Sequence, residues 1–274
     1  MRLRKILVRV LAAGAVTGWS TVLAGLTPVP GPVSGAETEI APPPPAAAEY
    51  GRVHHHFVRN DGQLDPEVLY YLKGPRGTVY LTAEEIVFDF VSGRPTPPDR
   101  HPTPGDEPRR EEDPVAPSRL VFRLRFPDAV SRPAVSGEDQ LPGRINYFVG
   151  PRENWRTGIP TFGEVAYRGL YPGIDLSIRF REGALAYRFT VSPGTDPGRI
   201  ALDYSGVEGL EIDPAGELIV LTGFGGFRTP APTAYQEIDG RPAEVKVSFK
   251  PRNKTTVALD IGERDPAHPL VVEF

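Results

Sequence analysis

The sequence contains no cysteine, and its single methionine is Met1. A chain without cysteine has no disulfide framework, no thiolate nucleophile and no thiolate metal site. Several catalytic and nucleotide-binding motifs are missing as well: there is no Gly-x-Ser-x-Gly, no His-Glu-x-x-His, no P-loop and no Gly-x-Gly-x-x-Gly in a strand–turn–helix context. These absences remove the usual sequence signatures of hydrolases, metalloproteases and nucleotide-binding proteins. We expect no cofactor and no bound metal.

Long amphipathic helices are also missing, since no segment keeps a helical apolar period for three turns. The 32 prolines and 29 glycines among 274 residues indicate many turns instead. The formal charge is −4, but the four basic residues before position 37 hide a more acidic remainder of 27 basic and 35 acidic side chains. A net charge of −8 on that remainder makes nucleic acid an unsuitable partner, because phosphate binding needs clustered Lys and Arg.

Residues 1–36 have the pattern of a secretory signal peptide. A basic start, MRLRK, precedes an apolar stretch, and Ser34-Gly35-Ala36 supplies small residues for cleavage before Glu37. The alternative is an uncleaved membrane anchor, because Val10 to Leu26 is a run of 17 uncharged residues. Either interpretation predicts a secreted or cell-envelope location, with membrane contact only through this segment if it is retained.

Two further stretches have too few apolar residues to fold. Residues 37–56 form a Pro/Ala-rich linker that contains Pro42–Pro45 and ends in three histidines; these could bind a metal, but a solvated linker end is the favoured interpretation. Residues 92–118 hold eight prolines and many charges. We expect a disordered loop there, with a binding lid as the alternative.

Alternating apolar residues from position 57 onward predict a β-rich domain over 57–274. Ile174, Leu176, Ile178 and Phe180 share one face of a strand, and a turn at 181–183 leads into a second alternating strand. Further short strands follow at roughly ten-residue intervals. The sequence predicts an all-β, antiparallel, sandwich-like module, with two packed β lobes (57–126 and 174–274) joined by a junction at 141–173 as the alternative arrangement.

The junction carries the candidate binding residues. Trp155 is expected in a polar loop, where it either plugs one end of the sandwich, the favoured interpretation, or stacks on a sugar ring. Aromatic neighbours and one carboxylate complete the candidates: Tyr147, Tyr167, Tyr171 and Asp175. Asp175 could work with Glu164 or Asp203 as a glycosidase-like acid pair, but a turn residue bonded to Arg168 or Arg179 is favoured.

Ordered short motifs connect this chain to a known family. They include Phe57-x-x-Asn60-x-Gly62-Gln63, Asn146-Tyr147-Phe148-x-Gly150, Tyr171-Pro172-Gly173-Ile174-Asp175-Leu176 and Pro232-x-Ala234-Tyr235-Gln236. The stretch from Phe57 to Phe274 resembles the N-terminal domain of unknown function of bacterial SBBP-repeat proteins, which are named for predicted seven-bladed β-propeller repeats. The resemblance implies an extracytoplasmic β-rich module. The chain stops where such repeats would begin, so the module is expected to act alone or with a separately encoded partner.

Two functions remain open on this evidence. The first is an exported, non-catalytic module with a structural, adhesion or interaction role, whose partners are extracellular proteins or glycans. The second is a carbohydrate-active hydrolase that uses Asp175 with another carboxylate. The exposure of Trp155 and the bonding of Asp175 discriminate between them.

Overall fold

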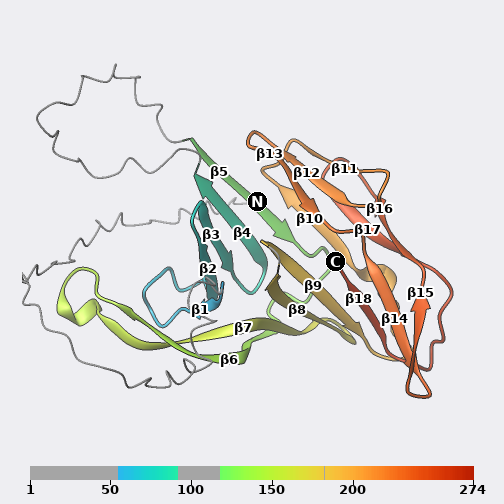
Figure 1. The fold of residues 1–274 in the computed structure, drawn as a ribbon, viewed down its shortest axis with the longest axis horizontal. Helices are drawn as coiled ribbons and strands as arrows, with labels where there is room; N and C mark the ends of the chain where they lie inside the picture. The colour runs from blue at the N-terminus through green and yellow to red at the C-terminus, as the bar shows by residue number, and fades with distance from the viewer. Residues whose placement is uncertain (1–54, 92–117, 182) are drawn as a thin grey trace, which may run out of the picture. The chain divides into compact units, whose positions relative to one another are not determined.

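The computed structural model describes residues 55–91, 118–181 and 183–274 (Figure 1). The predicted signal peptide, nearly all of the linker and the predicted loop at 92–117 lie outside these residues. The described part of the chain is nearly all strand, and every strand pairing in it is antiparallel. The prediction of an all-β, antiparallel fold is therefore confirmed. No helix in the described part is long and apolar enough to cross a membrane.

The elements follow one another with short connections. In chain order they are β1 (Phe57–Arg59), β2 (Tyr70–Gly74), β3 (Gly77–Leu81), β4 (Glu85–Val91), β5 (Arg119–Arg125), β6 (Ala134–Tyr147), a 3-10 turn (Arg152–Asn154), β7 (Arg156–Tyr171), β8 (Ile174–Arg181), β9 (Ala184–Val191), a second 3-10 turn (Pro197–Arg199), β10 (Ala201–Ser205), β11 (Gly209–Ile212), β12 (Leu218–Thr222), β13 (Gly225–Thr229), β14 (Thr233–Ile238), β15 (Arg241–Val245), β16 (Val247–Pro251), β17 (Thr256–Ile261) and β18 (Leu270–Glu273).

Strand β7 joins two halves of the main sheet. Its edge toward β6 is paired from Arg156 to Arg168. The opposite edge is shared, because Thr161 and Phe162 pair with β1 whereas Glu164 to Tyr171 pair with β8. One half-sheet runs β1-β2-β3-β4-β5-β10-β17-β16, and the other runs β8-β9-β18-β14-β15. The sheet boundary does not follow the chain, since strands after residue 174 belong to both halves.

The half-sheets come together again at the far side, where β15 of one half leads into β16 of the other through Lys246 alone. The sheet is not closed by hydrogen bonds there. Between the halves lies a single large core in which the predicted faces of β8 and β9 are found as expected. Ile174, Leu176 and Ile178 are fully buried, and Tyr187 and Phe189 of β9 face them. A separate three-stranded sheet, β11-β12-β13, adds Leu218 and Val220 to the same core.

A smaller apolar cluster covers the outer face of β1 to β4. Tyr71, Tyr80 and Val87 pack there against Ile159 of β7, and Tyr147 at the end of β6 packs against the cluster. The long β6–β7 hairpin thus contacts the first half-sheet before its end projects into solvent, as the yellow-green ribbon in Figure 1 shows.

Three strand predictions were wrong. The sequence predicted a short strand at 146–150 after a break at Pro142-Gly143, but β6 runs unbroken from Ala134 to Tyr147 with a register shift between Leu141 and Arg144. An edge strand tolerates proline at such a bulge. The single strand expected at 244–250 is two strands, β15 and β16, and the glycine-rich β13 was not predicted.

Candidate functional site

The end of the β6–β7 hairpin is built from a short run of turn residues. Gly150 adopts φ +70°, which ends the extended chain after β6. Pro151 then precedes the 3-10 turn Arg152–Asn154, and the Trp155 N–H closes this turn by donating to the Arg152 carbonyl at 3.1 Å. We call residues 148–155 the tip.

Two large aromatic side chains stand exposed at the tip. Phe148 is 57% exposed and Trp155 is 41% exposed. Their ring centroids lie 5.0 Å apart at an interplanar angle of 72°, the edge-to-face arrangement that aromatic pairs prefer. The indole Nε1–H donates to the Gly150 carbonyl at 3.2 Å, and the Arg152 guanidinium lies 5.8 Å from the centre of the Trp155 ring. The tip therefore presents a pre-ordered aromatic surface.

The favoured prediction for Trp155 was wrong. A tryptophan that plugged the end of the sandwich would be buried in the core, whereas Trp155 belongs to neither apolar cluster of the described chain. The interpretation that remains is an exposed platform on the tip. Tyr147, next in the chain to Phe148, is half-buried against the outer cluster and supports the tip from below.

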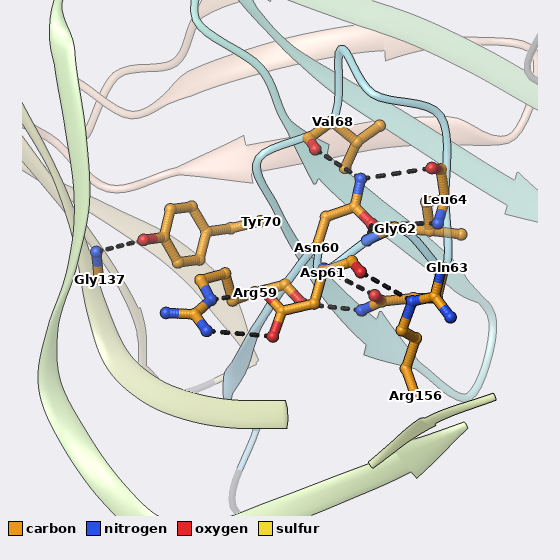
Figure 2. Close-up of polar contacts among 10 residues, drawn as sticks. All are labelled: Arg59, Asn60, Asp61, Gly62, Gln63, Leu64, Val68, Tyr70, Gly137 and Arg156. Atoms are coloured by element: carbon orange, nitrogen blue, oxygen red, sulfur yellow. Dashed lines mark hydrogen bonds and ion pairs between the residues drawn. The ribbon is translucent and has the colours of Figure 1, made fainter. Parts of the chain in front are cut away.

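The loop after β1 lies beside this hairpin and is held by one amide. The Asn60 Nδ2 group donates to the carbonyls of Asp65 and Val68 at 2.9 and 2.8 Å, and Asn60 Oδ1 accepts from the N–H groups of Gly62 and Leu64 (Figure 2). Gly62 has φ +98°, which an L side chain rarely adopts. This loop, residues 60–68, is called the clasp below.

A second amide completes the clasp. Gln63 Nε2 donates to the Arg59 carbonyl, and its Oε1 accepts from the Asp61 N–H, both at 2.7 Å. The Phe-x-x-Asn-x-Gly-Gln motif thus has a structural explanation, because each of its polar residues bonds the local backbone. The hydroxyl of Tyr70, the first residue of β2, accepts from the Gly137 N–H of β6 at 2.7 Å and adds a link to the hairpin (Figure 2).

Arg156 connects the clasp to the tip. Its Nε donates to the Asp61 carbonyl at 3.0 Å, and its NH1 donates to the carbonyls of Glu153 and Trp155, each at 3.0 Å (Figure 2). One guanidinium therefore bonds both loops, which orients the exposed Trp155 relative to the sheet.

Tyr167 and Tyr171 lie at the other end of β7, far along the chain from the tip. Both are buried; Tyr167 donates its hydroxyl to the Thr82 carbonyl at 2.9 Å. The Tyr171 hydroxyl is sealed from water near the backbone of Ala201 but completes no well-formed hydrogen bond. Burial raises the pKa of Tyr171 to about 12 and raises that of Tyr167 further. In this structure the two phenols are core residues that a ligand cannot reach.

Asp175 sits at the start of β8. Its Oδ1 accepts from the Gly169 N–H at 2.7 Å, and its Oδ2 pairs with Arg168 at 3.1 Å. The two carboxylates considered as its catalytic partners are bonded elsewhere: Glu164 pairs with Arg179, and Asp203 accepts from the Thr256 hydroxyl at 2.7 Å. The three acids are therefore not brought together as a couple.

Other outward-facing carboxylates also pair with arginine on a neighbouring strand. Buried Glu85 lies opposite Arg125 and bonds it at 2.7 Å, and Asp89 bonds Arg119 at 2.6 Å. Cross-strand pairs of opposite charge support sheet register. Within the described residues, no group of three or more His, Asp or Glu side chains could hold a metal ion.

Sequence reasoning selected Trp155 but missed the residues that make it a site. Phe148 was treated as part of a short strand, and Arg152 and Arg156 were counted only as loop polarity. A usable signal was present, since Phe148 and Trp155 flank a Gly-Pro pair that can turn the chain back on itself.

The fold and this hairpin define an antiparallel, all-β domain with an exposed aromatic tip. The chain belongs to the family described as Domain of unknown function (DUF7948), whose model matches residues 57–273. No curated protein and no solved structure matches the chain.

Proposed function

We propose that the domain is an exported, non-catalytic interaction module that binds its partner through the tip of the β6–β7 hairpin. The observation that carries this proposal is the pre-ordered pair of Phe148 and Trp155, which is exposed rather than used in packing. Tryptophan and arginine dominate the energetic centres of protein interfaces, and Arg152 stands beside the indole. Ordering before binding reduces the entropy that association costs.

A protein of the cell envelope or extracellular space is the partner that this chemistry fits best. A glycan is the second candidate for the same surface, because an exposed indole offers an apolar face to a sugar ring. The basic, apolar N-terminal segment supports export. The resemblance to modules of SBBP-repeat proteins supports a role next to propeller repeats, in the same or a separate chain.

The hydrolase alternative has weaker support. It needs two carboxylates of unequal pKa at a separation of about 5–10 Å across an open cleft. Asp175 instead spends both oxygens on Arg168 and the Gly169 N–H, as a turn residue does.

The experiment compares binding by the full chain with binding by Phe148→Ala/Trp155→Ala. Each protein is applied to a glycan array and to a bacterial cell-envelope fraction, with and without protease treatment of that fraction. We expect protease-sensitive envelope binding that the double variant weakens by about 2 kcal/mol or more. Phe224→Ala is the matched control, since Phe224 is an exposed aromatic on another turn. Equal binding by the wild type and the double variant would refute the proposal, and array binding lost in the double variant would identify a glycan.

A further inference from the structure

A second feature of the molecule, separate from the tip, is a cavity of about 620 Å³ at one end of the sandwich. Its walls come from the inner face of β2 to β5, from the β8–β9 hairpin and from the three-stranded sheet. Protein interiors pack densely, with few voids larger than a water molecule. A space of this size is in the range of about 300–1,000 Å³ that small-molecule sites occupy.

One wall of the cavity is a cluster of four phenylalanine rings. Phe88 and Phe122 stack with centroids 4.5 Å apart, and Phe90 and Phe227 stack at 5.1 Å. Phe122 is buried, but the other three keep part of their surface open. Phe180 and Leu185 of the β8–β9 hairpin line the facing wall. The walls offer a deep apolar slot that the core residues themselves do not fill.

Strand register shows how deep each lining residue lies. The β2–β3 turn and Gly183 mark the mouth, and Phe88 pairs with Phe122 further along β4 and β5. Tyr204 pairs with Leu124, one step deeper than Phe122, so it belongs to the floor. Tyr187 also lines the cavity, and burial raises the pKa of both phenols above the usual value. The floor therefore stays uncharged at physiological pH.

The charges around the cavity all have one sign. Its lining contains Arg76, Arg228 and His55 but no Asp or Glu, although the chain as a whole is acidic. Arg228 is balanced by Asp213 and Glu217, each at 2.8 Å. Arg76, on the exposed turn between β2 and β3, forms no ion pair with any described residue. A cation without a partner stands at the mouth of an apolar slot.

We infer that this cavity binds an amphiphilic anion, whose apolar body enters between the phenylalanine wall and the β8–β9 hairpin while its acidic head pairs with Arg76. Burial of the apolar body supplies most of the affinity, because it removes apolar surface from water. Arg76 sets the preference for the sign of the head, since an exposed ion pair adds only a small gain. The inference does not depend on the partner proposed for the tip.

The test uses decanoate, decanol and decyltrimethylammonium as probes, each titrated calorimetrically into the full chain below its micelle concentration. These share an apolar chain and differ in head charge. We expect saturable binding of decanoate, binding of decanol weaker by about two- to fivefold, and the weakest binding for the cation. Failure of both decanoate and decanol to bind saturably would overturn the inference. Binding of the cation as tight as that of decanoate would overturn the role of Arg76.

Variants locate the binding. Thr229 lies on the same face of β13 as Phe227 and lines the cavity, so Thr229→Phe should fill the slot and weaken both decanoate and decanol by about tenfold or more. Ala184→Phe fills it from the facing hairpin and gives the same test if the first variant fails to fold. Ser248→Phe adds the same ring at an exposed strand position outside the cavity and is the matched control.

Arg76→Gln separates the head from the body of the probe. It should lower the affinity for decanoate to that for decanol and leave decanol binding unchanged. Unaltered decanoate binding in both cavity-filling variants, each folded as judged by cooperative unfolding, would place the probe elsewhere and refute the site.

Discussion

The two ends of β7 contain similar residues and have opposite environments. From Glu164 to Tyr171 the strand is hydrogen-bonded on both edges, to β6 and to β8, and Tyr167 and Tyr171 are buried between the half-sheets. At Arg156 only the edge toward β6 is paired, and the adjoining Trp155 stands in solvent. Aromatic content alone does not distinguish core from surface in this hairpin.

What distinguishes the ends is the number of neighbouring strands. A strand paired on both edges and covered on one face buries its aromatic residues, whereas a hairpin that outruns its neighbours leaves them exposed. Phe148 and Trp155 pack only on each other and on Arg152. The inner end of β7 therefore maintains the fold, and the outer end is free to serve binding.

Alkaline pH should produce the largest effect, because it acts on the buried end alone. Burial raises the pKa of Tyr167, Tyr171, Tyr187 and Tyr204. A phenol whose pKa is higher in the folded state stabilises the fold fully below its unfolded pKa of about 10, and this stability is lost as pH rises from there toward the folded pKa. We expect cooperative unfolding above about pH 10, measured by circular dichroism together with phenolate absorbance. Complete ionisation of the tyrosines in a chain that stays folded would contradict the burial of that end.

Tyr167→Ala is the strongest single substitution at the same end. Removing a fully buried aromatic ring from the core should lower the free energy of unfolding by about 3–5 kcal/mol. Urea unfolding measures this change. Tyr167→Phe keeps the ring and loses only the hydrogen bond to the Thr82 carbonyl, so it should cost about 1 kcal/mol. Equal losses for the two variants would show that the hydroxyl, rather than packing, stabilises this end.

Period-two alternation made the core strands predictable from the sequence. Ile174, Leu176 and Ile178 face a buried layer, so the physical requirement and the sequence pattern coincide. The pattern fails where no face is fully buried: β6 is an edge strand with Pro142 at its bulge, and β13 begins with Gly225-Gly226. The crossing at Lys246 divides β15 from β16 and depends on pairing between distant segments, which no local pattern encodes.

The sites were predictable to a smaller degree. Trp155 could be selected because tryptophan in a polar loop is unusual, but its exposure depends on how far the hairpin outruns β1. The cavity could not be predicted, since its wall combines rings from β4, β5 and β13 that are far apart in the chain. Only the assembled sheets bring these rings together.

The clasp tests whether the tip depends on its neighbour. Asn60→Ala removes hydrogen bonds to the carbonyls of Asp65 and Val68 and from the N–H groups of Gly62 and Leu64. The expected loss is about 2–4 kcal/mol in the free energy of unfolding by urea. Asn253→Ala is a comparison in another turn, where the side chain accepts from Thr255 and Thr256, and it should cost about 1 kcal/mol. If Asn60→Ala costs no more than Asn253→Ala, the clasp is not a principal support of the hairpin.

Trp155→Ala should have the smallest effect on stability, although it removes the largest side chain of the tip. The indole is 41% exposed and lies outside both apolar clusters, so little buried surface is lost. Its Nε1–H bond to Gly150 is exposed, and water can replace it. We expect a change within about 0.5 kcal/mol in the free energy of unfolding, equal to that of Phe224→Ala. A loss as large as that of Tyr167→Ala would make Trp155 a structural residue after all, and the two ends of β7 would then differ in exposure without differing in role.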